Sequence, residues 1–221
     1  MNKLIVLLFA TVAVSLSAQA AEAQPAAPSA GSPSAPFTPQ AILTTMKKVA
    51  DWQLVQTNRH KTDDWTYGAL YAGMMALSDV ADSPRYHDAM MDMGRKHEWK
   101  PARRIYHADD HCVCQTYLEL YWQHRDRALI APTLERFDFI LAHARTNELE
   151  FRVKGAQERW AWCDALFMGP PAWLRAYLAT SDQRYLDFMD REWKFTSDYL
   201  YDKEEHLYYR DSTYFQKREA N

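Results

Sequence analysis

One aspartate, Asp164, lies in an aromatic and apolar stretch at residues 159–173 (RWAWCDALFMGPPAW). We expect a helix at 160–169 that carries Asp164 between Trp162 and Phe167, with neighbours that exclude water from the carboxyl group. Desolvation disfavours the charged form of a carboxyl and raises its pKa. A carboxylic acid that is protonated near neutral pH can act as a general acid. A single Asp on an apolar helix is also common without any catalytic role. The residues around Asp164 must therefore indicate whether it is catalytic.

A pair of adjacent carboxylates, Asp109 and Asp110, precedes another apolar segment. An ionised carboxylate close to Asp164 would raise the pKa of Asp164 further, because like charges repel. The competing explanation is structural, since an Asp at a helix start accepts hydrogen bonds from free backbone N–H groups. We expect one of these two aspartates to have that capping role.

The cysteines and nearby histidines do not form a recognisable metal motif. His107 and His111 stand four residues apart beside Cys112 and Cys114, but no fourth ligand is evident and the HExxH pattern is absent. We therefore expect neither a metal ion nor a cofactor. Cysteines two residues apart rarely bridge, so at most one disulfide, to Cys163, is expected, and buried free thiols are the favoured state.

Apolar residues recur at three- and four-residue spacing through most of the chain, which predicts an all-α fold. The helices are expected at residues 39–52, 65–79, 84–97, 109–123, 131–145, 160–169, 171–180 and 183–200, joined as antiparallel pairs. The Gly169-Pro170-Pro171 sequence should end or kink the helix that carries Asp164, because proline lacks a backbone donor. The aromatic and partly alternating tail at 205–215 predicts a short extended segment.

An internal repeat indicates helical hairpins. The sequence ALYAG at 69–73 is echoed by ALFMG at 165–169, and SPRYHD at 83–88 is echoed by DQRYLD at 182–187. Trp65, Asp110 and Asp164 then mark successive units, and each spacing accommodates one hairpin, so the inner helices would begin at the same end of a curved stack. A closed ring of six such hairpins needs roughly twice this length. We therefore expect about the first half of an (α/α)6 toroid.

The N-terminus has the features of a secretory signal peptide at residues 1–20, cleaved before Ala21. Lys3 is followed by an apolar run and by the small-x-small sequence Ala18-Gln19-Ala20. The run is too short for a comfortable membrane span, so we expect export to the periplasm or the extracellular space without membrane attachment. Residues 21–37, rich in Ala, Pro and Ser, are expected to be a flexible leader. Residues 38–221 then form one partial domain.

The charge distribution excludes two classes of partner. The chain carries 26 Lys and Arg residues against 29 Asp and Glu residues, a net charge of −3. No run of Lys or Arg is dense enough to indicate binding to nucleic acid or to an anionic membrane surface.

Three motifs, in this order, resemble glycoside hydrolase families 88 and 105, the unsaturated uronyl hydrolases, which include unsaturated rhamnogalacturonyl hydrolases. They are DWTYG at 64–68, HADDHCVCQTY at 107–117 and WAWCDALFM at 160–168, and YYRD at 208–211 is similar to a segment of the family's middle region. The resemblance covers about residues 40–221. It implies an (α/α)6 barrel that removes the terminal 4,5-unsaturated uronic acid left by polysaccharide lyases on oligosaccharides, with fragments of the pectin and rhamnogalacturonan type preferred.

The resemblance also implies the chemistry. A protonated aspartic acid donates its proton to C4 of the vinyl ether, the same group activates the water that attacks C5, and the resulting hemiketal opens. Asp164 matches the catalytic aspartate. Asp110 matches the second active-site aspartate, which would be ionised, orient the sugar hydroxyls and raise the pKa of Asp164. The adjacent Asp109 is the alternative for that role and is a candidate for substrate binding.

Three aromatic residues at expected inner-helix starts, Trp65, Tyr67 and Trp162, are further candidates for substrate binding. Aromatic rings with a polar atom can stack on a sugar ring and donate a hydrogen bond to its carboxylate. Core packing is the competing explanation for each of them.

The chain differs from the family at its end, because no sequence of the form W-x-R-G-N-G-W, expected to bind the substrate carboxylate, occurs before Asn221. We therefore expect a truncated product or a fragment, whose exposed apolar edge could pair with a second copy. One alternative is a non-catalytic exported helical-repeat protein that binds a glycan or a partner with the same concave face. Another is an epimerase-like toroid, which would need histidine acid–base pairs. The Asp110 and Asp164 pairing favours hydrolase ancestry over both.

Overall fold

Helices dominate the residues that the computed structural model describes, 37–56 and 59–215. The α-helices are α1 (Pro39–Val55), α2 (Trp65–Val80), α3 (Arg85–Lys96), α4 (Cys112–His124), α5 (Ala131–Ala142), α6 (Ala165–Met168), α7 (Pro170–Thr180) and α8 (Gln183–Leu200). Single 3-10 turns are η2 (Ala108–His111), η3 (Arg127–Leu129), η4 (Ala156–Glu158) and η5 (Ser212–Tyr214). The all-α prediction is confirmed.

The expected extended segment in the tail is also present. Strands β1 (Tyr201–Asp202) and β2 (Leu207–Tyr208) form a short antiparallel hairpin in which Tyr201 is opposite Tyr208. The expected signal peptide and nearly all of the expected leader lie outside the described residues. No helix in the described part is long and apolar enough to cross a membrane.

The prediction of a helix at 160–169 is wrong for the first half of that range. Residues 160–164 are not helical, and α6 contains only the four residues that follow them. The backbone of this segment is engaged elsewhere, because Cys163 N–H donates to Arg210 O (2.9 Å) and Thr196 Oγ1 donates to Trp160 O (2.8 Å). The break at the Gly-Pro-Pro sequence is confirmed, since α7 begins at Pro170. The helix expected at 131–145 ends earlier, at Ala142.

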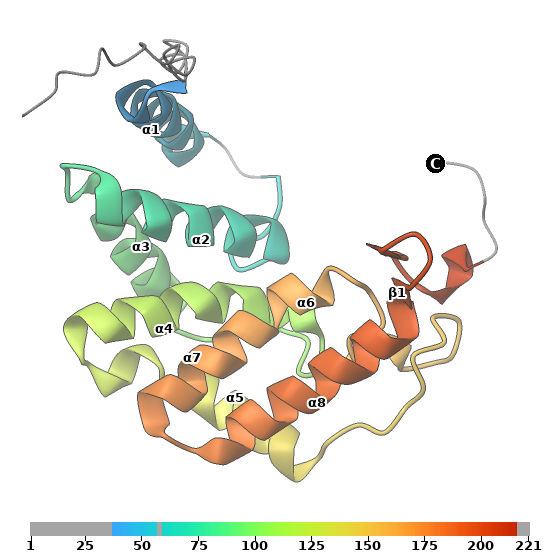
Figure 1. The fold of residues 1–221 in the computed structure, drawn as a ribbon. Helices are drawn as coiled ribbons and strands as arrows, with labels where there is room; N and C mark the ends of the chain where they lie inside the picture. The colour runs from blue at the N-terminus through green and yellow to red at the C-terminus, as the bar shows by residue number, and fades with distance from the viewer. Residues whose placement is uncertain (1–36, 57–58, 216–221) are drawn as a thin grey trace, which may run out of the picture.

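Three helices, α2, α4 and α7, form a central layer in which α4 contacts the other two. The helix α3 packs on α2, and α8 packs on both α7 and α5, so successive hairpins lie next to one another (Figure 1). The turn η2 directly precedes α4 and contacts both α2 and α6. The residues before α4 and α6 therefore meet at one end of the stack, as the repeat predicted.

Side-chain caps fix where several helices begin. The side chains of Thr38, Asp64 and Asp182 accept hydrogen bonds from backbone N–H groups at the starts of α1, α2 and α8. Such bonds satisfy donors that have no partner within the helix. The polar residue before each of these helices therefore sets its first turn.

The core is built around Trp173 of α7, which is fully buried. Its ring stacks on Phe137 of α5 at 3.9 Å between centroids and on Phe188 of α8 at 4.1 Å. Its Nε1 donates to Nδ1 of His111 (3.4 Å), so the other ring nitrogen, Nε2, donates to Ile105 O (2.9 Å). Burial lowers the pKa of His111 to about 4, which keeps the ring neutral. This contact ties the segment before η2 to α7.

An apolar groove of about 1040 Å³ lies along α7 and α8. Its exposed side chains include Phe167, Leu174, Leu178 and Trp193, and Asp164 also lines it. The expectation of an exposed apolar edge therefore agrees with the structure. Pairing of two copies across this groove stays a prediction.

Two glycines of α2 have different surroundings. A Cβ atom added at Gly68 would lie 2.9 Å from Sγ of Cys112 and 3.0 Å from the backbone N of Val113, whereas a Cβ added at Gly73 would meet nothing within 4 Å. The close approach of α2 to the start of α4 therefore depends on the missing side chain at Gly68.

Gly68→Ala is expected to lower the free energy of unfolding, because overpacking of this kind costs about 1–3 kcal/mol. Gly73→Ala on the same helix is the matched control and should raise it by about 0.5–1 kcal/mol, since alanine has the higher helix propensity. Urea unfolding of both variants measures the difference. Equal stabilisation by both substitutions would contradict the close contact between α2 and α4.

Candidate active site

Asp164 stands directly before the first residue of α6, and its backbone carbonyl accepts hydrogen bonds from Phe167 N (2.9 Å) and Met168 N (3.1 Å). Its side chain makes no capping hydrogen bond to that helix. The carboxyl group is half-buried and faces a narrow cavity. The residues that line this cavity are His107, Ala108, Asp109, Gln157, Trp160, Ala161, Trp162, Asp164 and Ala165.

The pKa of Asp164 is raised, first by burial and then by the negative charge of Asp109. Backbone N–H groups and His107 act in the opposite direction but do not cancel the effect. The raised pKa agrees with the expectation from the sequence. The neighbouring charge comes from Asp109, which shares the cavity, whereas Asp110 does not line it.

One guanidinium group, that of Arg104, holds both buried aspartates. Its Nε donates to Oδ1 of Asp110 (2.9 Å) and one terminal nitrogen donates to Oδ2 of Asp109 (3.1 Å). The backbone N–H of Arg104 donates to the other oxygen of Asp110, so both oxygens of Asp110 are engaged within the protein. Asp110 therefore holds the backbone at Arg104 in place, whereas Asp109 binds Arg104 and also lines the cavity.

The expected capping role of an aspartate at the start of α4 is wrong. The residue before η2 is His107, and its Nδ1 accepts a hydrogen bond from Asp109 N (3.4 Å). The residue before α4 is His111, which makes no side-chain cap because its ring is directed into the core. Arg104 competes successfully for the carboxylates, since an ion pair with a hydrogen bond is stronger than a neutral contact.

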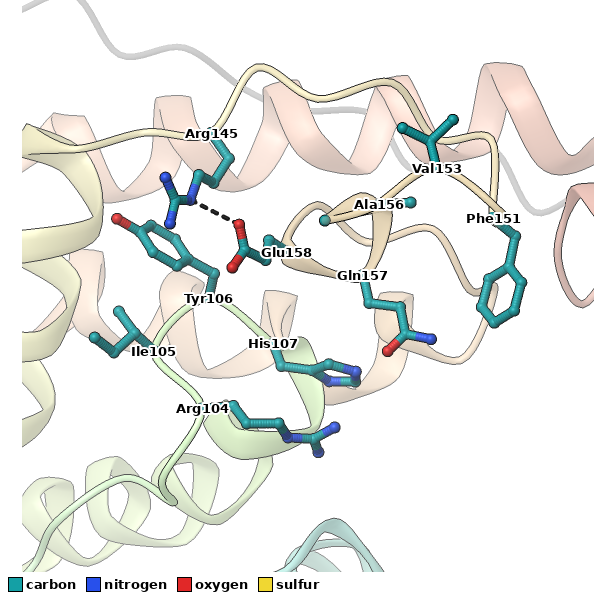
Figure 2. A pocket seen from close by; sticks show the side chains of 11 residues that line it. Arg104, Ile105, Tyr106, His107, Arg145, Phe151, Val153, Ala156, Gln157 and Glu158 are labelled. Carbon is teal, nitrogen blue, oxygen red and sulfur yellow. Dashed lines mark ion pairs between the residues drawn. The ribbon is translucent and has the colours of Figure 1, made fainter.

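His107 brings a further polar group to the cavity. The residue is 8% exposed, and burial lowers the pKa of its ring against the opposing influence of Asp109. Its Nδ1 accepts from a backbone N–H, which places the proton of the neutral ring on Nε2. The side chain of Gln157, which lines the same cavity, forms a hydrogen bond with the ring and raises its pKa in opposition to burial (Figure 2).

The structure brings one of the three candidate aromatic residues to the cavity. Trp162 lines it, stacks on Phe151 at 5.4 Å between centroids, and has a buried Nε1 without a hydrogen bond among the described residues. Trp65 is 41% exposed at the first position of α2 and is not part of the cavity wall. Tyr67 lines a different cavity, between α1, α2 and α3, and lies beside Tyr71.

Four polar residues near the cavity were not predicted as site residues: Arg104, His107, Gln157 and Arg210. From the sequence, His107 was a candidate only for metal binding. The guanidinium of Arg210 lies 6.0 Å from the ring centroid of Trp162 and pairs with the buried Asp211 (2.9 Å). The signal for Arg210 was the YYRD segment, which was used only as part of the resemblance.

The cysteines agree with the expectation of buried free thiols at two of three positions. Cys112 and Cys114 are free and buried, and burial raises the pKa of each to about 12. Cys163 is also free and is half-buried. The described residues contain no cluster of three or more His, Cys, Asp or Glu side chains placed to hold a metal ion.

Comparison with known proteins identifies the family. The family model described as Glycosyl Hydrolase Family 88 matches residues 40–221. Two curated relatives are both named unsaturated 3S-rhamnoglycuronyl hydrolase. The one from Alteromonas sp. (strain LOR) is 31% identical over 210 residues, covering 82% of this chain and 51% of the relative. The one from Formosa agariphila is 30% identical over 162 residues, covering 70% and 42% respectively.

Two solved structures share the fold. A protein described as a polysaccharide lyase superposes with a TM-score of 0.70 at 22% identity, over 82% of this chain and 52% of that one. A family 88 glycosyl hydrolase from Bacteroides vulgatus superposes with a TM-score of 0.62 at 23% identity, over 78% and 51%. These matches confirm the prediction of a partial α/α toroid. The chain spans about half the length of the curated relatives it matches.

The electrostatic interaction between the two carboxyl groups of the cavity can be tested by titration. Asp109→Asn is expected to lower the pKa of Asp164, because it removes the negative charge that disfavours ionisation. The group would then lose its proton at a lower pH. Asp110→Asn is the matched control and should have the smaller effect. Carbon-13 NMR of the aspartate carboxyl groups measures both, and a larger shift in Asp110→Asn would contradict the assignment.

Proposed function

This chain belongs to glycosyl hydrolase family 88, and we propose that the protein carrying it releases the terminal 4,5-unsaturated uronic acid from oligosaccharides made by polysaccharide lyases. The observation that carries the proposal is the pairing of Asp164 with Asp109 across one narrow cavity. A hydrolase of this family is also what the names of the two curated relatives indicate. Export through the expected signal peptide at residues 1–20 is part of the proposal.

In the proposed mechanism, Asp164 is the general acid. Its carboxyl donates a proton to C4 of the vinyl ether, and positive charge develops at C5 and the ring oxygen. The resulting carboxylate takes a proton from water while the water oxygen bonds to C5. The hemiketal that forms then opens, and the rest of the oligosaccharide leaves. The raised pKa of Asp164 supports the first step, since the acid must be protonated to donate.

Asp109 and Arg104 support this role of Asp164 in different ways. The charge of Asp109 favours the protonated form of Asp164, and it would also attract the cationic centre that develops on the sugar ring. Arg104 balances the charge of Asp109 and holds it in place. Asp110 acts through Arg104, because both of its oxygens are occupied by that residue.

For the substrate we propose an unsaturated uronate linked to rhamnose. Both curated relatives are named for action on a 3-sulfated rhamnoglycuronyl unit. The rhamnogalacturonan type favoured from the sequence shares the rhamnose but lacks the sulfate. Rhamnose is therefore the feature common to both sources of inference.

Asp164→Asn is expected to keep the fold and to lower turnover by at least about 10⁴-fold. One carboxyl group both protonates the double bond and activates the attacking water, so both steps are lost. The assay uses the protein that carries Asp164 as the enzyme. It follows the loss of absorbance of the conjugated double bond in the unsaturated uronate substrate. The control is Asp187→Asn, an aspartate of α8 outside the cavity, which should have wild-type rates. Retention of more than about a tenth of turnover in Asp164→Asn would move the acid role to another carboxyl.

The aglycone is tested with two disaccharides that differ only by a 3-sulfate on rhamnose. If the chain follows its curated relatives, kcat/KM should be higher for the sulfated compound, by about tenfold or more for one charge-assisted contact. Equal rates would support the unsulfated rhamnogalacturonan type. Hydrolysis of neither compound would contradict the proposed function.

A further inference from the structure

A pair of histidines links α3 to α4. Nε2 of His87 lies 2.9 Å from Nε2 of His124, and the two residues are 37 positions apart in the chain, so no sequence motif indicates the pair. His87 is the third residue of α3 and His124 is the last residue of α4. Since α4 has 13 residues, the pair lies about 18 Å from the start of α4, where the Asp164 cavity lies.

A carboxylate fixes the proton of the His87 ring. Oδ1 of Asp88 lies 3.3 Å from Nδ1 of His87, and a carboxylate can only accept a hydrogen bond. In the neutral ring Nδ1 therefore carries the proton, and Nε2 presents a lone pair toward His124. A histidine that binds a metal ion usually donates its other ring N–H to a carboxylate in the same way, which orients the ring and makes the ligating nitrogen more basic.

Two imidazole nitrogens that face each other need either a proton on one of them or a cation between them. If His124 carries its proton on Nδ1, both Nε2 atoms present lone pairs, and a divalent metal ion satisfies both. Two zinc–nitrogen bonds of about 2.0–2.1 Å at a tetrahedral angle place the nitrogens about 3.3 Å apart, so the pair has to open by about 0.4 Å. His124 is exposed, so its ring can make this movement.

The charges around the pair favour a cation. Asp88 lies in the first turn of α3, and His124 lies at the C-terminus of α4, the negative end of that helix dipole. The neighbouring arginines are engaged elsewhere. Arg85 forms an ion pair with an aspartate of α1 (3.3 Å), and the guanidinium of Arg125 lies 4.2 Å from the ring of Trp122.

We propose that His87 and His124 bind a zinc ion, or another divalent transition metal ion that imidazole favours, with water in the remaining coordination positions. The ion clamps α3 to α4, whereas the rest of α3 packs mainly on α2. A structural zinc site has four protein ligands, so this site with two exchanges its metal ion readily. The inference is independent of the proposed function, because the pair lies far from Asp164.

The test is titration calorimetry of the chain with zinc chloride. His124→Gln removes one ligand at an exposed position and should weaken zinc binding by at least about tenfold. His60→Gln removes an exposed histidine outside the pair and is the matched control, with the zinc affinity of the wild type. Zinc that binds His124→Gln as tightly as the wild type would overturn the proposal, because it would be bound elsewhere, for example by the free thiol of Cys163.

Two further titrations test the kind of site. Asp88→Asn leaves both imidazole rings in place and removes the carboxylate that orients His87, so zinc affinity should fall by about tenfold to a hundredfold. Magnesium chloride should give no binding at the pair, since magnesium prefers oxygen ligands. Magnesium binding that His124→Gln abolishes, or an unchanged zinc affinity in Asp88→Asn, would contradict coordination by an oriented imidazole pair.

Thermal unfolding tests the clamp itself. A metal ion that binds only the folded chain raises the unfolding temperature, so zinc chloride should raise Tm of the wild type and of His60→Gln but have little effect on His124→Gln. Without zinc, Tm of His124→Gln should be close to that of the wild type, because the replaced side chain is exposed. An equal zinc-dependent rise in Tm in the wild type and in His124→Gln would count against the link between α3 and α4.

Discussion

Two adjacent buried carboxylates cannot both be held in a protein interior without a cation, and in this structure a single arginine meets that requirement. Arg104 binds Asp110 through its side chain and its backbone N–H, and it binds Asp109 through a terminal nitrogen. The pairing fixes the segment before η2 and directs Asp109 toward Asp164. Without it, the cost of burying uncompensated charge would open this end of the stack.

A second buried ion pair supports the loop that carries Trp160 and Trp162 of the cavity wall. Arg159 donates to both oxygens of Glu192 on α8 (3.0 and 3.3 Å) and to Asn147 O (2.7 Å), and its guanidinium lies 4.1 Å from the ring of Phe195. These contacts anchor both ends of the long loop between α5 and α6 to α8. The loop can therefore present Trp162 to the cavity although it contains little regular structure.

The fold was largely predictable from local patterns. The starts of α2 and α8 were found because an apolar period of three to four residues follows a polar cap, and proline set the start of α7. The non-helical conformation of the segment before Asp164 was not predicted, because its backbone bonds to Arg210 and Thr196, which are distant in sequence. Composition alone favoured helix there, and tertiary contacts overrode it.

The sequence by itself determined the helical hairpins, the family and the identity of Asp164 as the candidate acid, since these depend on residue types and spacing within short segments. Only the tertiary structure decided which carboxylate lies next to Asp164. Asp109 and Asp110 are neighbours with the same chemistry and both bind Arg104, but the one-residue difference around η2 places only Asp109 in the wall of the cavity. The same holds for Tyr67, His107 and Gln157, because whether a side chain faces a cavity depends on how distant segments pack.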